Sequence, residues 1–571
     1  MHKVGAFLFV CAGLLALALL PPRPAAAAWP TDPLVNVPLC TATGDQQFPT
    51  IVSDGAGGAI VTWQDQRGGN YDIYAQRISA AGTVQWTTDG VALCTIAGEQ
   101  SSPTIVADGA GGAIVTWQDL RSGISDIYTQ RISDGGAVQW TANGVALCTA
   151  SGAQQYPTII SDGTGGAIVT WQDQRSGTSR DIYAQRISAG GTVQWTANGV
   201  ALCTMYSDQS SPTIVSDGTG GAIVDWRDER SGNNDIYAQR ISVGGTVQRT
   251  ANGVALCTAS GEQQYPTIVS DGVGGAIVTW VDGRTGTRDD IYAQRISAGG
   301  TVQWTANGVA LCTATDYREY PAILSDGASG AIVTWGDYRS GGGTYTNPDI
   351  YAQRISAAGT VQWTANGVAL CTATGFQVHA TIASDGAGGA IVTWWDNRRS
   401  AADLYAQRIS AGGTVQWTAN GVALCTATNF RDYPTIVADG AGGAIITWYD
   451  GRSGYGDIYA QRVCAWGQLG DCPGADAPGD AALTFALDPV RPNPTRAGTL
   501  TVRFTLASAA AASLELLDVA GRRIATREVG SLGTGRHALD LGEGQRLAPG
   551  LYLVCLRQGT NTRVTRVAVL K

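Results

Sequence analysis

The sequence is poor in lysine, histidine and methionine, and this scarcity excludes several classes of protein. Its 571 residues include only Lys3 and Lys571 as lysines, with two methionines and three histidines, and the formal net charge is -9. An acidic chain without a basic stripe does not suit nucleic acid, whose phosphates require clustered positive charge. The histidines and cysteines show no spacing typical of a metal site. We therefore predict no nucleic-acid partner, no metal and no other cofactor.

Long apolar runs are also scarce, and the one that is present lies at the N-terminus. Lys3 precedes an apolar stretch at 4–20, and Ala26–Ala28 offers small residues before Trp29. This pattern is typical of a signal peptide over residues 1–28. No later segment is long and apolar enough to span a membrane. We expect an exported protein that has no transmembrane segment after the signal is cleaved.

One unit of about 54 residues recurs eight times within residues 29–470. Each unit contains four short β-like runs separated by Asp-Gly, Gly-Gly and Ser-Gly turns. Four strands in a unit of this length are typical of a propeller blade. The 3.6-residue periodicity of a helical solenoid is absent. The units begin at Pro49, Pro103, Pro157, Pro212, Pro266, Pro321, Ala380 and Pro434.

The two ends of the repeat array complement each other. The eighth unit reaches Val463 and then lacks the last strand of the other units, whereas a similar strand at residues 35–40 precedes the first unit. If the N-terminal strand completes the last blade, no sheet edge is left exposed. The sequence therefore predicts an eight-bladed β-propeller over residues 29–470, closed by the strand at 35–40.

The chain changes character after residue 470. Residues 471–482 form a linker rich in Pro, Gly and Ala, and residues 483–571 contain short alternating strands separated by turn residues. This spacing predicts a small β-sandwich. The expected fold class is all-β, with the propeller followed by an Ig-like β-sandwich.

Five motifs within residues 483–571 occur in an order that resembles a known family. In chain order they are Pro492-Asn493-Pro494, the alternating strand at 500–506, Leu517–Arg522, Gly535–His537 and Ala548–Tyr552. This order is similar to the C-terminal sorting domain of type IX secretion, and to the Ig-like domain of flagellar hook-capping proteins. The resemblance implies that the type IX machinery recognises 483–571 and delivers the protein to the medium or to the outer surface of a bacterial cell.

Every unit carries the sequence Trp-x-Asp-x-Arg. Alternation along a strand places these three side chains on one face. They could hold a sugar through ring stacking and hydrogen bonds, but their presence in all eight units favours a charge-assisted network between packed blades. In the first and eighth units these residues are Trp63, Asp65, Arg67, Trp448, Asp450 and Arg452.

The cysteines fall into two groups. One cysteine recurs with each of the eight units, the first of them in the N-terminal strand at 35–40. Equivalent positions on adjacent blades should lie farther apart than a disulfide allows. We therefore predict that these eight cysteines are buried free thiols. Cys464 and Cys472 are eight residues apart at the end of the array, and they could form a disulfide.

One face of the predicted ring varies more than the other. The length changes of the array fall between the second and third strands, and the residue before each unit start also differs. Because strands alternate in direction, both variable sets lie on one face, opposite the constant glycine-rich turns. Steric limits on glycine turns would also explain that constancy. We predict that a ligand binds the variable face through Phe48, Tyr156, Tyr265, Tyr320, His379 and Tyr433.

The sequence predicts no catalytic residue, because acidic residues are too frequent in the repeated turns to nominate an acid–base pair. The main prediction is a secreted or cell-surface, non-enzymatic protein that binds a glycan or a protein ligand. The alternatives are a sialidase-like, glycan-cleaving propeller and a structural surface protein without a ligand. A catalytic site would have to break the eightfold repetition, so the irregular stretch Gly341–Pro348, with Phe376–His379 nearby, is where to look.

Overall fold

The computed structural model divides the chain into two compact units, which are described separately. Their bounds are Met1–Asp476 and Ala477–Lys571. The predicted signal peptide, most of the predicted linker and the Pro492-Asn493-Pro494 motif lie outside the described residues. The described residues are 29–341, 346–399 and 402–472 in the first unit, and 485–488, 490, 495–496, 500–506, 512–529, 535–541, 547–559 and 561–570 in the second.

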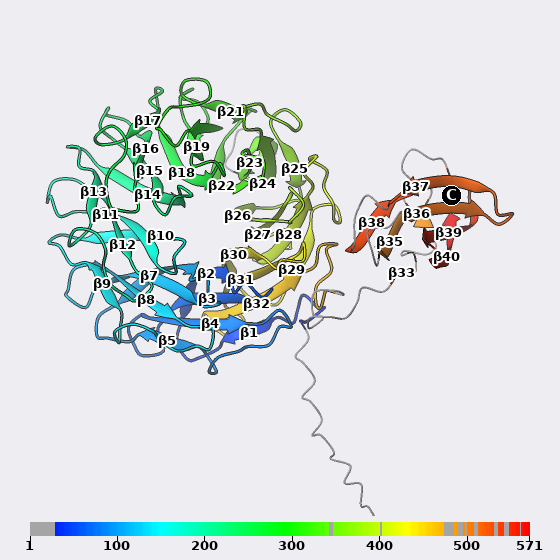
Figure 1. Ribbon diagram of the computed structural model, residues 1–571, viewed down its shortest axis with the longest axis horizontal. Coiled ribbons are helices and arrows are strands. Elements are labelled where there is room, and N and C mark those ends of the chain that lie inside the picture. Colours follow the sequence, from blue (N-terminus) through cyan, green and yellow to red (C-terminus); the bar gives the residue numbers. More distant parts are fainter. Residues whose placement is uncertain are drawn as a thin grey trace, which may run out of the picture. The chain divides into compact units, whose positions relative to one another are not determined.

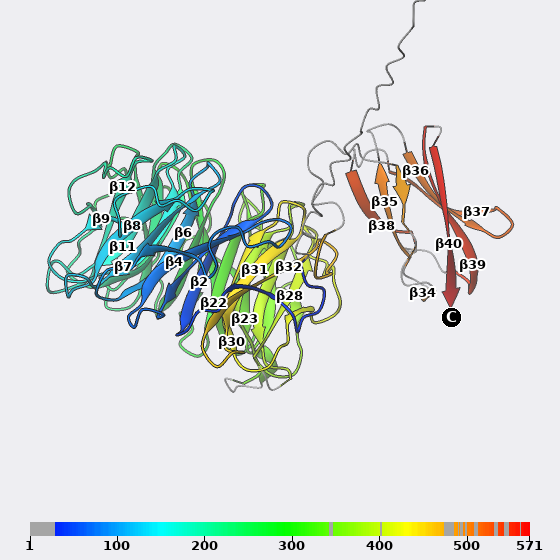
Figure 2. The ribbon, with the colours of Figure 1, turned by 90° about the horizontal axis from the view of Figure 1, so that it is seen from below.

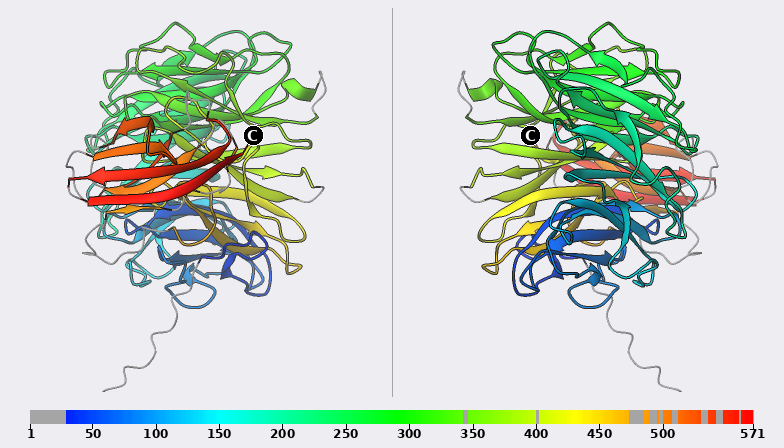
Figure 3. Two further views of the ribbon diagram at one scale, coloured as in Figure 1. Left: turned by 90° about the vertical axis from the view of Figure 1, so that its right-hand side faces the viewer. Right: turned by 90° about the vertical axis from the view of Figure 1, so that its left-hand side faces the viewer.

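The first unit is an eight-bladed β-propeller, as the repeats predict. Eight four-stranded antiparallel sheets follow one another around a ring (Figure 1). In each blade the first strand of the unit lies nearest the ring axis, and the fourth lies at the outer edge (Figure 1). Figure 2 and Figure 3 show the ring from its sides, where the loops emerge on two faces.

The strands of each blade follow from the alternating runs of its unit. From the inner strand outward, blades one to four consist of β2 (Gln46–Ser53), β3 (Ala59–Asp65), β4 (Asp72–Ile78), β5 (Val91–Cys94); β6 (Gln100–Ala107), β7 (Ala113–Asp119), β8 (Asp126–Ile132), β9 (Val145–Cys148); β10 (Gln154–Ser161), β11 (Ala167–Asp173), β12 (Asp181–Ile187), β13 (Val200–Cys203); β14 (Gln209–Ser216), β15 (Ala222–Asp228), β16 (Asp235–Ile241) and β17 (Val254–Cys257). Blades five to seven consist of β18 (Gln263–Ser270), β19 (Ala276–Asp282), β20 (Asp290–Ile296), β21 (Val309–Cys312); β22 (Arg318–Ser325), β23 (Ala331–Asp337), β24 (Asp349–Ile355), β25 (Val368–Cys371); β26 (Gln377–Ser384), β27 (Ala390–Asp396), β28 (Asp403–Ile409) and β29 (Val422–Cys425), and a 3-10 turn, η1 (Arg339–Gly341), follows β23.

The eighth blade combines both ends of the array. Its inner strands are β30 (Arg431–Ala438), β31 (Ala444–Asp450) and β32 (Asp457–Val463). The N-terminal strand β1 (Val37–Cys40) pairs antiparallel with β32 and supplies the outer strand. The last blade therefore has four strands like the others, and the ring is closed by hydrogen bonds between the two ends of the array.

Apolar contacts between neighbouring blades hold the ring together. Because neighbouring blades cover both of its faces, the second strand of a blade is almost wholly buried, and β3 is buried along its whole length. At the first interface, Ile60 and Ile73 of blade one lie in one buried cluster with Val115 and Trp117 of blade two. Equivalent clusters recur at the other interfaces, so each blade depends on its neighbours for its core.

The second unit is a β-sandwich of two sheets around one apolar core. A three-stranded sheet has the order β33 (Ala486–Leu487), β35 (Thr501–Leu506) and β38 (Gly535–Asp540). A five-stranded sheet has the order β34 (Thr495–Arg496), β40 (Asn561–Leu570), β39 (Gly550–Gln558), β36 (Ala512–Asp518) and β37 (Arg523–Glu528). Side chains from both sheets, among them Val502, Phe504, Leu514 and Val554, form the core.

Candidate functional site

The repeated Trp-x-Asp-x-Arg residues form a closed network inside each blade. The indole N–H of Trp63 donates to Asp65 Oδ2 at 2.8 Å, and Arg67 Nη2 donates to the same oxygen at 2.6 Å. Trp63 is fully buried, so its ring cannot stack on a sugar. The equivalent distances are 2.8 and 2.6 Å in the eighth blade, where the residues are Trp448, Asp450 and Arg452.

A cysteine of the neighbouring blade completes this network. Arg67 Nη2 donates to the Sγ atom of Cys40 at 3.0 Å, and Cys40 lies on the outer strand of the eighth blade. The Asp65–Arg67 ion pair therefore lies within one blade, and the cysteine links it to the preceding blade. The prediction had placed the charged network between blades. Burial raises the pKa of Cys40 to about 12, so the thiol stays protonated.

The loops that lead into the inner strands meet the loops between the second and third strands on one face. The backbone N–H of Gln100 donates to Tyr71 O at 2.7 Å, and that of Gln154 donates to Ser125 O at the same distance. These bonds connect each blade to the one before it. The face that varies most in sequence is therefore a continuous surface.

Each inner strand has a β-bulge near its start, and the predicted ligand-binding residues occupy this bulge. In β2 the pairing with β3 shifts between Gln47 and Thr50, and Phe48 has a φ of 51°. A positive φ is unfavourable for residues other than glycine and often marks a functional position. The same conformation occurs at all eight equivalent positions: Phe48, Ser102, Tyr156, Ser211, Tyr265, Tyr320, His379 and Tyr433.

Five of the six predicted residues contact one another in a row around the axis, which we call the axial arc. Its members, in order, are Tyr265, Tyr320, His379, Tyr433 and Phe48, and successive ring centroids are 5.2, 5.6, 6.4 and 4.6 Å apart. The four aromatic rings remain 38–48% exposed. The sixth residue, Tyr156, is separated from the arc because blades two and four carry serine at the bulge.

Ionisable side chains break the eightfold repetition beside the axial arc. The residue before the bulged position is Gln, Ser or Val in six blades, but it is Glu319 in blade six and Asp432 in blade eight. His379 of blade seven lies between them, and its Nδ1 is 3.0 Å from Asp432 Oδ1. The Tyr338 hydroxyl donates to Glu319 Oε1 at 2.6 Å, and the backbone N–H of Tyr433 donates to Asp432 at 2.7 Å.

The surroundings shift the pKa values of two of these groups upward. Burial raises the pKa of Glu319 above its usual range, although the Tyr338 hydrogen bond and the charge of His379 oppose the shift. The hydrogen bond to Asp432 raises the pKa of His379 against the opposing effect of burial, and the charges of Asp432 and Glu319 add to the rise. A carboxyl group whose pKa is raised, beside an imidazole–carboxylate pair, suits general acid–base chemistry.

A small cavity opens beside Glu319, between blades five and six. Its volume is about 150 Å³, and its lining includes Tyr265, Glu319, Tyr320 and Tyr338. It gives the Glu319 carboxyl group open space on the face that carries the axial arc.

Residues 342–345, in the longest loop between the second and third strands of a unit, lie outside the described residues. The backbone N–H of Gln377 donates to Pro348 O at 2.8 Å, and that of Gly375 donates to Asn347 Oδ1 at 2.8 Å. The described end of this loop is thus attached to the segment that carries His379.

Sequence reasoning missed Glu319 and Asp432. It weighed acidic residues by their frequency in turns, where every unit has some. An alignment of the eight units at the bulge would have shown that only these two units carry an acid before the bulged residue.

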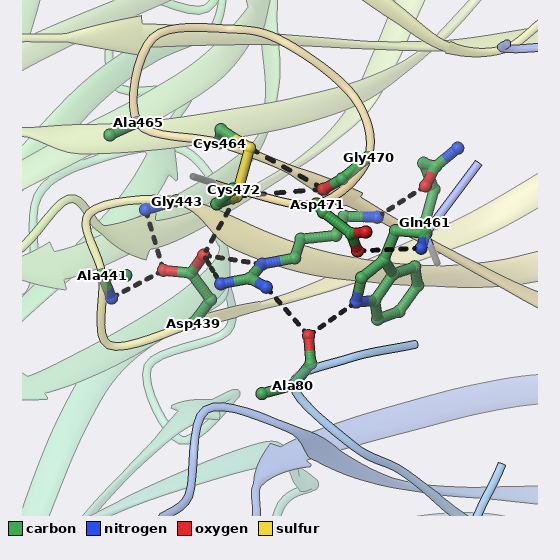
Figure 4. Close-up of a disulfide and its surroundings, with 12 residues drawn as sticks. Ala80, Asp439, Ala441, Gly443, Gln461, Cys464, Ala465, Gly470, Asp471 and Cys472 are labelled. Atoms are coloured by element: carbon green, nitrogen blue, oxygen red, sulfur yellow. Dashed lines mark hydrogen bonds and ion pairs between the residues drawn. A yellow bond between two sulfur atoms is a disulfide. The ribbon is translucent and has the colours of Figure 1, made fainter. Parts of the chain in front are cut away.

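Two further observations concern the cysteines and metal-binding side chains. Cys464 and Cys472 form a disulfide at the end of the array (Figure 4). In the ranges that the structure describes, no three His, Cys, Asp or Glu side chains are placed to hold a metal ion.

The C-terminal unit matches a known family. Residues 490–570 match the family described as "Secretion system C-terminal sorting domain". The tail is a type IX sorting domain. It links the protein to the type IX secretion machinery, and the protein is therefore secreted or attached to the outer surface of a bacterial cell. Across the described ranges of both units, no helix has the length and apolar character needed to cross a membrane.

Several solved structures match part of this chain. An endo-arabinase from Bacteroides thetaiotaomicron has 14% identity and a TM-score of 0.27, over 43% of this chain and 92% of that one. An α-L-arabinofuranosidase from Fusarium graminearum in complex with an iminosugar inhibitor has 11% identity and a TM-score of 0.30, over 55% of this chain and 93% of that one. An α-L-arabinanase from Penicillium chrysogenum in complex with arabinobiose has 14% identity and a TM-score of 0.30, over 54% of this chain and 92% of that one. No curated protein sequence matches the chain.

These comparisons contradict the prediction of a non-enzymatic binding protein. The similar structures named above are an endo-arabinase, an α-L-arabinofuranosidase and an α-L-arabinanase, whereas the main prediction is a non-enzymatic protein. At 11–14% identity and TM-scores of 0.27–0.30, the likeness carries no argument about the chemistry of this chain. The axial arc and the ionisable residues beside it are therefore the basis for any chemistry proposed for this chain.

Proposed function

We propose that the propeller hydrolyses glycosidic bonds outside the cell, at the axial arc. The observation that carries this proposal is the placement of Glu319 and Asp432 on either side of His379, among exposed aromatic rings. Aromatic side chains offer flat apolar faces on which sugar rings can stack. Glycoside hydrolysis generally requires two carboxyl groups that flank the bond to be cleaved.

The two carboxyl groups would have different tasks. Glu319 is the general acid, because burial favours its protonated form and the leaving-group oxygen needs a proton. Asp432 is the second carboxylate, which either activates water or attacks the anomeric carbon. His379 holds one Asp432 oxygen in place and balances its charge. Tyr338 orients the Glu319 carboxyl through its hydroxyl hydrogen bond.

The proposal is tested with the purified mature protein on a panel of polysaccharides that includes arabinan, with release of reducing ends as the measurement. We expect Glu319→Gln and Asp432→Asn each to lower kcat by about 100-fold or more, the usual loss on removing a general acid or base. Gln155→Asn is the matched control, because it changes the same position in a blade outside the arc, and it should leave kcat unchanged. Full activity in both carboxyl variants, or no cleavage of any polysaccharide in the panel, would overturn the proposal.

A further inference from the structure

Trp29 fills a position that the eighth unit lacks. In six units the segment between the third and fourth strands carries a tryptophan whose indole N–H donates to a backbone carbonyl in a turn of the next blade, as Trp86 does to Asp134 O at 2.9 Å. Trp29 donates in the same way to Ala80 O at 2.9 Å, and its ring lies over Gly82 as the Trp86 ring lies over Gly136. With 1% exposure, Trp29 is part of the ring's core.

The backbone nitrogen of Trp29 is bound by a carboxylate from the other end of the array. It donates to Asp471 Oδ1 at 3.1 Å. Asp471 precedes Cys472, whose disulfide with Cys464 ties this segment to the end of β32 (Figure 4). Nearby, the Gln461 side-chain amide donates to Pro30 O at 3.2 Å. The acceptor for the Trp29 nitrogen is thus fixed covalently to the eighth blade.

We propose that cleavage between Ala28 and Trp29 completes the closure of the ring. Water adds across this peptide bond under the action of a signal peptidase, which leaves a carboxylate on Ala28 and an α-ammonium group on Trp29. The new cation then pairs with the Asp471 carboxylate. A charge-assisted hydrogen bond is stronger than one from a neutral amide, and an ammonium group has three donors instead of one. Maturation of the N-terminus therefore strengthens the contact between the two ends of the propeller.

A thermodynamic cycle on the mature protein tests this proposal. One form begins at Trp29, and the other retains Ala28, which removes the ammonium group from Trp29 but keeps its side chain. Each form is compared with its Asp471→Asn variant by denaturant unfolding at low salt. In the form that begins at Trp29, we expect Asp471→Asn to lower the ratio of folded to unfolded protein by about two- to fivefold, the range of a partly exposed ion pair. In the form with Ala28 the same change should have a much smaller effect.

Two controls make the result specific. Asp134→Asn neutralises a turn carboxylate elsewhere on the propeller and should act equally in both forms. Mass spectrometry of the secreted protein should place its first residue at Trp29. Equal effects of Asp471→Asn in the two forms, or a mature N-terminus at another residue, would refute the role of the ammonium group.

Discussion

Asp225 makes the propeller's stability depend on pH. It lies in the central strand β15, where the other seven blades have threonine. In those blades the threonine hydroxyl donates to a backbone carbonyl of the next strand, as Thr62 does to Tyr74 O at 2.8 Å. Asp225 is fully buried; Thr213 donates to its Oδ1, while no described residue forms a hydrogen bond with its Oδ2. Burial raises the pKa of Asp225 from 3.8 to about 7.

The size and sign of the effect follow from this shift. Below pH 3.8 the carboxyl group is protonated in both the folded and the unfolded protein, so its ionisation does not lower the free energy of unfolding. Between pH 3.8 and about 7 only the unfolded chain loses its proton, so the free energy of unfolding falls as pH rises. The shift is roughly 3 pKa units at about 1.4 kcal/mol each, so the loss reaches at most about 4 kcal/mol above pH 7.

The test is Asp225→Thr, which restores the residue of the other blades. Guanidinium unfolding of the wild type and the variant is measured from pH 4 to pH 8. We expect a small difference in free energy of unfolding at pH 4 and a stabilisation of several kcal/mol, up to about 4, at pH 8. Thr279→Asp, in the equivalent position of blade five, should create the same pH dependence. A difference between Asp225→Thr and the wild type that does not change with pH would refute the reasoning.

Other predictions concern the site, the thiols, the closure and the sorting domain. The Tyr338 hydrogen bond lowers the pKa of Glu319, so Tyr338→Phe should move the basic limb of the kcat/KM profile to higher pH; an unmoved limb would exclude Glu319 as the acid. Cys40 and its equivalents should react with a thiol reagent only after unfolding, and rapid labelling of the native protein would contradict their burial. Deletion of residues 29–45 should leave the outer edge of β32 unpaired and cause aggregation or a large loss of stability; a stable monomer would argue against closure by β1. Residues 483–571 should export a fused passenger from a type IX-competent cell, whereas a passenger retained in the periplasm would count against their role.

The repeats made the architecture of the propeller predictable, but not all of its contacts. Glycine turns and alternating apolar residues recur in every unit, so the number of blades and the approximate strand positions could be read from the sequence. The role of Trp29 could not, because it lies outside every repeat and only the folded ring brings it to Ala80. Alternation placed Asp65 and Arg67 on one face, but it could not show that Cys40 of another blade accepts from the arginine.

The site was only partly predictable for a related reason. The aromatic residues were visible as variable positions, and Glu319 and Asp432 would have been visible in an alignment of the units. The contact of His379 with Asp432 depends on the bulge. A residue before proline ordinarily prefers an extended conformation, yet Tyr320 and Tyr433 precede proline and have φ values of 48° and 52°. Local sequence preference therefore gives no indication of where these side chains lie.

The bulges separate the residues that pack the blades together from the residues to which we assign the proposed chemistry. Phe, Ser, Tyr and His all occupy the bulged position with nearly the same backbone conformation, while the Trp-x-Asp-x-Arg network below stays the same in every blade. Substitutions at the bulge therefore need not disturb the packing between blades. The eight bulged positions around the axis are therefore sites at which ligand specificity can be redesigned one blade at a time, while the packing between blades stays unchanged.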